Sequence, residues 1–503
     1  MKNEDKRKNN RKRKCRQKMS AALLVLLLGF TGCGRADRGQ IEEDISEASV
    51  GTATDADAAM GISMGEIPEH ITYEKINESS GNYSKVDADV IVPDVTSYSV
   101  YEEKKIEIDD DYLKTLAGNL FDNGEYEQIK PAWMCTEEEL ETERAYIDVL
   151  ANAYNLDEFA EGYEGEKGDL AFACLPDWLY QLYFYYNEVN YDSSTEAELT
   201  EEKLIYRYEN SYDENGDTYM IDCEACTLRG NVDGKEWILY YQNTLDDDMW
   251  LFKTVDGNAI VVQEGYTKNM LVLSSVESGA VGEISSQDNY LDANKYGDNI
   301  SDEAQCRQTV CDFAEKLGLS EDMEIVCVNN RVVTDADGNK NLNGYRMYMA
   351  PVINGVPNYF SNMMCLSTKN ESGSQYAYQE YIVFDVSSDG ISNVYIAAQY
   401  EIGDCLAKDA NMLTFEQVDM IAQEHIQEIV ETPTEGISSH YTFDRIQLAY
   451  ATVQYDEGYS LVPVWMYYLK YDKEYLYHQA CFGINALDGS VFIACGSYTN
   501  MFY

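Results

Sequence analysis

Histidine side chains are the first candidates for metal or acid–base chemistry, and the chain has only four of them. None has the His-Glu-x-x-His spacing that puts two zinc ligands on one helix face. His425 and Glu428 could act as ligands from one helix face, although a packed or hydrogen-bonded histidine explains this position better. His70, His440 and His478 have no partner nearby in the sequence. The histidines therefore predict no metal site.

A cysteine pair offers redox spacing in Cys223-Glu224-Ala225-Cys226. Thioredoxin-like chemistry depends on a cysteine at a helix N-terminus, which lowers the pKa of the thiol. Here the pair lies in a strand pattern, so ordinary strand packing is the favoured interpretation. A redox or metal role and a local disulfide are the alternatives.

Two further segments match short functional motifs. Gly61-Ile62-Ser63-Met64-Gly65 matches the nucleophile elbow of α/β-hydrolases, but that elbow needs a strand-to-helix turn and no strand pattern precedes this copy. Asp335-Ala336-Asp337-Gly338-Asn339 hints at calcium, yet an EF-hand would have Gly in place of Lys340 and Glu in place of Arg346. We interpret the first as a chance match and the second as a hairpin turn.

The densest aromatic cluster contains Trp178, Tyr180, Tyr183, Tyr185 and Tyr186. Such a cluster can stack on sugar rings or hold a peptide, but aromatic residues more often pack in a core. The sequence has no Ser-x-x-Lys, P-loop or dinucleotide-binding fingerprint. We therefore predict no enzyme activity, no catalytic residues, no cofactor and no metal site.

These candidate residues depend on a scaffold of mixed helices and strands. Apolar spacing predicts helices over 111–121 and 136–154 and strands over 219–228, 235–242, 249–254 and 259–263. Asp233-Gly234 and Asp256-Gly257 supply turns between the strands.

Residues 300–503 contain two copies of one pattern, a helix followed by four strands. In the first copy Ser301 is expected to cap a helix, followed by strands over 324–333, 344–351, 377–386 and 391–398. The apolar face of that helix comprises Val310, Phe313, Ala314 and Leu317.

The second copy begins with a capping box formed by Thr414 and Gln417. Its helix has an apolar stripe of Val418, Ile421, Ala422, Ile426, Ile429 and Val430, and strands are predicted over 441–453, 459–471, 476–485 and 490–494. Asp389-Gly390 and Asp488-Gly489 occupy the same turn in the two copies. We predict tandem α+β domains, each with one helix across a mostly antiparallel sheet.

The N-terminus has the organisation of an export signal. Residues 1–18 contain ten Lys or Arg and two acidic residues, followed by the apolar run 21–30 and a small-residue site before Cys33. This run is too short to cross a hydrocarbon core of ~30 Å, which needs ~20 helical residues. A cleaved signal is therefore favoured over a lasting transmembrane span.

Phe30-Thr31-Gly32-Cys33 resembles the bacterial lipobox, with Phe30 where that motif usually has Leu. The resemblance implies a diacylglycerol on the sulfur of Cys33, with acyl chains such as palmitate, and cleavage before this residue. The alternative is an ordinary signal peptidase site beside a stray cysteine. Two acyl chains on one residue give stable membrane anchoring, which one chain does not.

Acidity dominates the rest of the chain. Removing the signal's net charge of +8 from −53 leaves −61 from Cys33 onward. Nucleic acid and anionic lipid surfaces are therefore poor partners, because phosphate binding needs positive charge. Basic partner surfaces, cationic peptides and divalent metals remain compatible with this charge, which also serves solubility.

Eleven cysteines lie beyond Cys15 and Cys33, at irregular spacing. An odd number without regular spacing is not a disulfide framework. In an exported protein, unpaired cysteines indicate a reducing or anaerobic setting, where they behave as small buried hydrophobes.

The two C-terminal copies carry a family resemblance. Segments 344–346 and 353–357, set against 461–465 and 484–489, resemble the tandem domains of YycH/YycI-type regulators and, more loosely, PepSY-like modules. The chain also resembles uncharacterised lipoproteins of Gram-positive bacteria, in which 86–93 opens the folded part. The first resemblance implies extracellular domains that restrain a membrane sensor kinase.

Together these features predict a signal peptide over 1–32, a flexible acidic tether over 33–66, an N-terminal α+β domain over 67–295, and α+β repeats over 296–405 and 406–503. We expect a lipid-anchored protein on the extracellular face of the cell membrane. The expected function is non-enzymatic binding or regulation of a membrane or envelope protein partner. The alternatives are a solute- or carbohydrate-binding lipoprotein and, less favoured, an envelope hydrolase. The oligomeric state is not predicted.

Overall fold

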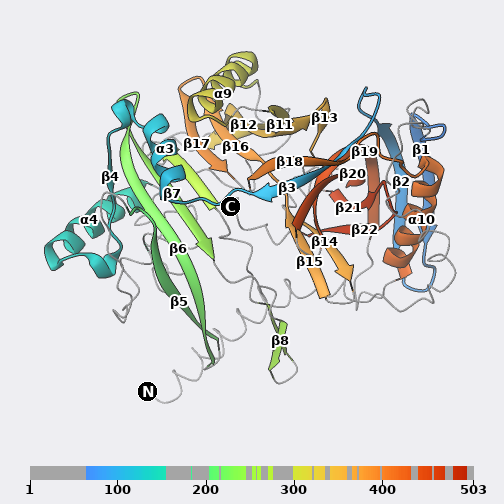
Figure 1. The fold of residues 1–503 in the computed structure, drawn as a ribbon, viewed down its shortest axis with the longest axis horizontal. Coiled ribbons are helices and arrows are strands. Elements are labelled where there is room, and N and C mark those ends of the chain that lie inside the picture. Colours follow the sequence, from blue (N-terminus) through green and yellow to red (C-terminus); the bar gives the residue numbers. More distant parts are fainter. Residues whose placement is uncertain are drawn as a thin grey trace.

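A computed structural model describes most of the chain after the expected tether. The described residues are 64–153, 183, 203–214, 217–244, 252–255, 258–261, 270–275, 298–319, 322–334, 340–358, 365–370, 373–396, 399–431, 440–455, 458–470 and 480–495. Within them, helices pack on two large sheets, and β3 and β18 lie on the side of the second sheet that is nearer the first (Figure 1). The predicted α+β class is confirmed. The signal peptide, Cys33 and nearly all of the expected tether lie outside the described residues.

Sheet I contains ten described strands in the order β11-β12-β16-β17-β10-β7-β6-β4, with β5 also paired to β6 and β13 to β12. Their bounds are β4 Tyr126–Gln128, β5 Tyr206–Glu214, β6 Asp217–Val232, β7 Lys235–Thr244, β10 Met270–Ser275, β11 Met323–Thr334, β12 Lys340–Ile353, β13 Val356–Pro357, β16 Ile382–Ser387 and β17 Gly390–Ile396. A separate hairpin joins β8 Phe252–Val255 to β9 Asn258–Val261.

Sheet II also contains ten described strands, in the order β1-β2-β19-β20-β21-β22-β14-β15, with β3 joining β20 to β18. Their bounds are β1 His70–Ile76, β2 Tyr83–Ile91, β3 Val100–Lys105, β14 Cys365–Asn370, β15 Gly373–Tyr378, β18 Tyr400–Ala407, β19 His440–Tyr455, β20 Gly458–Leu469, β21 Ala480–Asn485 and β22 Val491–Cys495. All pairs are antiparallel except β2 with β19.

The helices cover defined faces of these sheets. Their bounds are α3 Asp110–Leu120, α4 Glu137–Ala153, α9 Glu303–Leu317 and α10 Phe415–Glu431, with short 3-10 turns η1 Asp122–Gly124 and η2 Ala132–Met134. α3 and α9 share one apolar core with sheet I. On β6, Leu228 joins that core, whereas its neighbour Arg229 contacts Glu143 of α4 at 3.3 Å, so α4 lies on the opposite face. α10 packs against sheet II.

Both predicted C-terminal copies have the expected connectivity. α9 is followed by the antiparallel series β11-β12-β16-β17, and α10 by β19-β20-β21-β22. The matching turns use Gly390 and Gly489, whose φ values of 105° and 78° favour glycine. The capping box of the second helix is also confirmed, because Thr414 and Gln417 exchange hydrogen bonds of 2.9 and 3.3 Å.

The cap of the first helix differs from the prediction. Asp302, not Ser301, occupies the N-cap position and accepts a hydrogen bond from the Gln305 backbone N–H at 2.8 Å. Ser301 is buried instead, and its hydroxyl accepts from the Ser388 backbone N–H at 3.0 Å. Its oxygen therefore ties the helix entry to the turn between β16 and β17.

The strand predicted over 377–386 is two strands in different sheets. β15 ends at Tyr378 in sheet II, and β16 begins at Ile382 in sheet I. The hairpin of β14 and β15 lies within the first copy in sequence but extends the sheet of the second copy by pairing with β22. The crossing falls at Gln379-Glu380-Tyr381, a polar break that the predicted strand ran through.

A third set of elements follows the same plan. β5, β6, β7 and β10 form another antiparallel series, and α3 packs with the apolar residues of β6 and β7. Its last strand pairs with the last strand of the first copy, Leu271 opposite Ile396. Sheet I therefore contains two helix-and-four-strand units joined through their final strands.

The sheets do not follow the boundaries drawn from the sequence. β1, β2 and β3 belong to the segment 67–295 but pair with the second copy in sheet II. The other strands of that segment, apart from the β8–β9 hairpin, continue the sheet of the first copy. No helix among the described residues is long and apolar enough to span a membrane.

Candidate binding face

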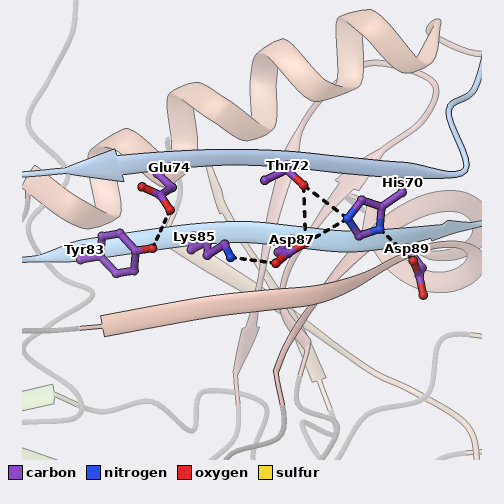
Figure 2. A network of polar contacts seen from close by, with 7 residues as sticks. All are labelled: His70, Thr72, Glu74, Tyr83, Lys85, Asp87 and Asp89. Carbon is purple, nitrogen blue, oxygen red and sulfur yellow. Dashed lines mark hydrogen bonds and ion pairs between the residues drawn. The ribbon is translucent and has the colours of Figure 1, made fainter.

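The outer face of β1 and β2 carries an ordered group of polar side chains (Figure 2). The antiparallel register places His70 opposite Asp89, Thr72 opposite Asp87, and Glu74 opposite Lys85. Because side chains alternate along a strand, these pairs share one face. We call this set, together with Tyr83, the β1–β2 polar face.

His70 is held between two carboxylates. Its Nδ1 lies 2.8 Å from Asp89 Oδ1 and its Nε2 lies 2.9 Å from Asp87 Oδ1. Only the doubly protonated imidazolium can donate to both, because a neutral ring has one N–H. Lys85 Nζ donates to the other oxygen of Asp87 at 2.7 Å, and Thr72 Oγ1 lies 3.3 Å from His70 Nε2 (Figure 2).

These contacts set the charge of the group. The hydrogen bond with Asp89, and then that with Asp87, raises the pKa of His70. Lys85, and then His70, lowers the pKa of Asp87. At the far end, Tyr83 donates its hydroxyl to Glu74 Oε1 at 3.1 Å. The face thus contains three carboxylates, one lysine and one histidine that can be charged.

The opposite face of the same strands is apolar and anchors them. Val86 and Ala88 of β2 are fully buried in the core that contains Val418, Ala422 and Ile426 of α10. Ile71 and Tyr73 of β1 pack against this core. The polar side chains are therefore presented on strands whose backs are fixed by α10.

The face borders β19 in sheet II. The parallel register places His440 beside Tyr83 and Thr442 beside Lys85. The rings of Tyr83 and His440 meet edge to face, with centroids 6.2 Å apart. His440 therefore lies against the end of the face, at a distance along β2 from His70.

His425 is a packed histidine, as the sequence favoured. His425 on α10 packs edge to face on Phe482 with ring centroids 4.8 Å apart, and its Nδ1 lies 3.6 Å from Glu428 Oε2. Among the described residues no group of three His, Cys, Asp or Glu side chains could hold a metal ion. His478 lies outside those residues.

The Cys223–Cys226 pair is resolved at one position. Cys226 is a free, fully buried thiol in the core of sheet I. Burial raises the pKa of this thiol, which is the opposite of what a redox cysteine needs. Strand packing is thus the role of Cys226, while the side chain of Cys223 lies outside the described residues.

The nucleophile-elbow match and the calcium-like segment lie largely outside the described residues. Ser63 lies outside the described residues, and Met64 and Gly65 lead to strand β1, not to the helix that a nucleophile elbow requires. The segment 335–339 also lies outside them; its flanking residues Thr334 and Lys340 pair between the antiparallel strands β11 and β12. Of the aromatic cluster only Tyr183 is described, and it is buried.

The β1–β2 polar face was missed from sequence because its residues looked isolated. The signal was present in the alternation of Val86-Asp87-Ala88-Asp89-Val90, which marks a strand with one acidic face. What the sequence does not show is that His70 lies across from Asp89.

No family model and no curated protein matches this chain. A solved structure of an uncharacterized protein from Eubacterium rectale ATCC 33656 aligns over 84% of this chain and 93% of its own, with 13% sequence identity and a TM-score of 0.37. The function is therefore argued from the residues themselves.

Proposed function

We propose that this chain is a lipid-anchored extracellular binding protein, without enzymatic activity, that engages a basic partner of the membrane or cell envelope through the β1–β2 polar face. Support for the anchor comes from the export signal and the lipobox-like segment ending at Cys33. The observation that carries the binding role is His70 held by Asp87 and Asp89 on an exposed strand face.

Charge favours a basic partner. Asp89 is 78% exposed, so its carboxylate can accept from an incoming cation, whereas Asp87, 44% exposed, already accepts from His70 and Lys85. The chain beyond Cys33 has a net charge of −61, whose field adds to that of these residues. Complementary charge of this kind speeds association and rejects acidic competitors.

The position of the face suits a membrane partner. Met64 lies 64 − 33 = 31 positions after Cys33, and a fully extended chain of that length spans at most ~110 Å. β1 follows almost at once, which restricts the polar face to that distance from the bilayer.

Capture from native membranes tests this function. Cells expressing the wild-type chain or the Asp87→Asn, Asp89→Asn double variant would be crosslinked and the captured proteins identified. The proposal expects a basic membrane or envelope protein with the wild type and at least a fivefold loss with the variant.

A matched variant controls for charge alone. Glu401→Gln with Asp404→Asn removes two exposed carboxylates from β18 instead. It should capture the same partner as the wild type. Equal capture by both double variants would overturn the assignment of the face.

A further inference from the structure

One buried and one partly buried glutamate lie where the chain passes between the sheets. Glu103 on β3 is only 4% exposed. Glu380 follows the last strand of the β14–β15 hairpin and precedes β16. Glu103 lies opposite Ile402 in the register of β3 and β18, and the backbone N–H of Tyr400, two residues before Ile402, contacts Glu380, so both carboxyls belong to one junction although they are far apart in sequence.

Three passages between the sheets converge at this point. The chain leaves β3 for α3, leaves β15 for β16, and leaves β17 for β18. The Ile106 backbone N–H donates to the Gln399 carbonyl at 2.8 Å, which ties the first passage to the third. The Tyr400 N–H donates to Glu380 Oε2 at 3.4 Å, which ties the third to the second.

Side chains complete the connection. Gln379 exchanges two hydrogen bonds of 2.9 Å with the backbone of Thr452 on β19. Tyr112 of α3 donates to Gln399 Oε1 at 2.6 Å. We call this set of passages and contacts the inter-sheet junction.

We propose that Glu103 and Glu380 form a proton-operated lock, which holds the inter-sheet junction closed while both carboxyls are protonated and loosens it as they ionise. Ionisation would place two carboxylates at a junction that largely shields them from water, where they repel each other and lose hydration.

The titration range is near neutral. Burial, offset in part by the Thr452 hydroxyl, raises the pKa of Glu103 to about 7. Burial and then Glu103 raise the pKa of Glu380 to about 8. A basic residue, Lys105, lies opposite Tyr400 in the register of β3 and β18, and both carboxyl pKa values are raised in its presence.

Three tyrosines lie at or beside the junction. Burial raises the pKa of Tyr112 to about 12. Tyr400 and Tyr459 pack against each other with ring centroids 5.3 Å apart. The closed junction binds protons more tightly than an open one, so closure is favoured below the ordinary carboxyl value of ~4.3 and weakens up to about pH 8.

Hydrogen exchange of the full-length chain in detergent tests the lock. After correction for intrinsic rates, protection of the amides of Ile106, Tyr400 and Thr452 should fall at least about tenfold between pH ~5.5 and ~8.5, since one pKa unit is tenfold in an equilibrium constant. Amides in the middle of β12 and β20 serve as the internal reference. Uniform loss there would show a change in global stability and overturn the lock.

Isosteric variants separate the lock from simple packing. Glu103→Gln with Glu380→Gln should hold protection at the junction constant over the same range, while Glu401→Gln, on exposed β18, should follow the wild type. A wild type with no pH dependence at the junction would overturn the proposal without any variant. So would amide variants that lose protection as steeply as the wild type.

Discussion

Arg346 donates two parallel hydrogen bonds to Asp385 within sheet I. Nε and Nη2 of the guanidinium each lie 2.7 Å from a different carboxylate oxygen, and both residues are buried. Burial alone would raise the pKa of Asp385, but Arg346 and Arg331 lower it overall. Such a pair is costly to break because one charge is left buried and unpaired.

Replacement of Asp385 by Asn should therefore lower the free energy of unfolding by about 3–5 kcal/mol. Asp389→Asn, four residues on in an exposed turn, should change it by less than about 0.5 kcal/mol. Urea denaturation followed by circular dichroism measures both. Similar values for the two variants would contradict the importance of the pair.

His70 should titrate above the ordinary histidine value of ~6.5, because its pKa is raised. Its ion pairs favour the folded chain fully below that ordinary value and lose this contribution as pH rises through the raised pKa. NMR titration of the ring protons measures the pKa directly. Asp89→Asn should lower it more than Asp87→Asn, and an unchanged pKa in both variants would refute the network.

Gly344 should not tolerate a side chain. Its φ is 86°, and an added Cβ would collide with the Val386 carbonyl oxygen. Gly234 has φ 76° with nothing within 4 Å of an added Cβ, so it is the matched control. Gly344→Ala should cost about 2 kcal/mol more than Gly234→Ala in urea denaturation. Equal costs would show that the neighbouring strand yields.

Cys33→Ala should abolish the lipid mass on the mature chain and its partition into detergent. Cys15→Ala, within the basic start of the signal, should leave both unchanged. Mass spectrometry and detergent phase separation decide the result. A Cys33→Ala chain that still enters the detergent phase would refute the anchor.

Association with a captured partner should slow as salt rises, since the Debye length falls from ~10 Å at 0.1 M to ~3 Å at 1 M. A charged encounter loses its association rate, whereas an apolar contact changes mainly its dissociation rate. Surface plasmon resonance across this range separates the two. An association rate independent of salt would show that charge does not direct binding.

Local features were predictable because their causes lie within a few residues. Thr414 and Gln417 fix the start of α10 through contacts across one turn. Ser301 and Asp302 illustrate the limit, since either can cap a helix. The choice depended on a distant turn at Ser388 that accommodates the Ser301 hydroxyl.

Long-range pairing accounts for what could not be predicted. Nothing near Glu103 in sequence indicates Glu380, and nothing near His70 fixes its register with Asp89. A pattern of alternation predicts which face a strand buries, but not which strand lies beside it. The pairing of the β14–β15 hairpin with β22 of sheet II could not be predicted for the same reason.

The parallel pairing of β2 with β19 cannot form until late in synthesis. Tyr83 pairs with His440, which is synthesised 440 − 83 = 357 residues later. At ~5–20 residues per second that delay is roughly 20–70 s. Throughout it, Val86 and Ala88 lack their native cover, and the edge of β2 is open to any passing strand. Asp87 and Asp89 alternate with those apolar residues, and charge of this kind on an open edge strand disfavours edge-to-edge pairing.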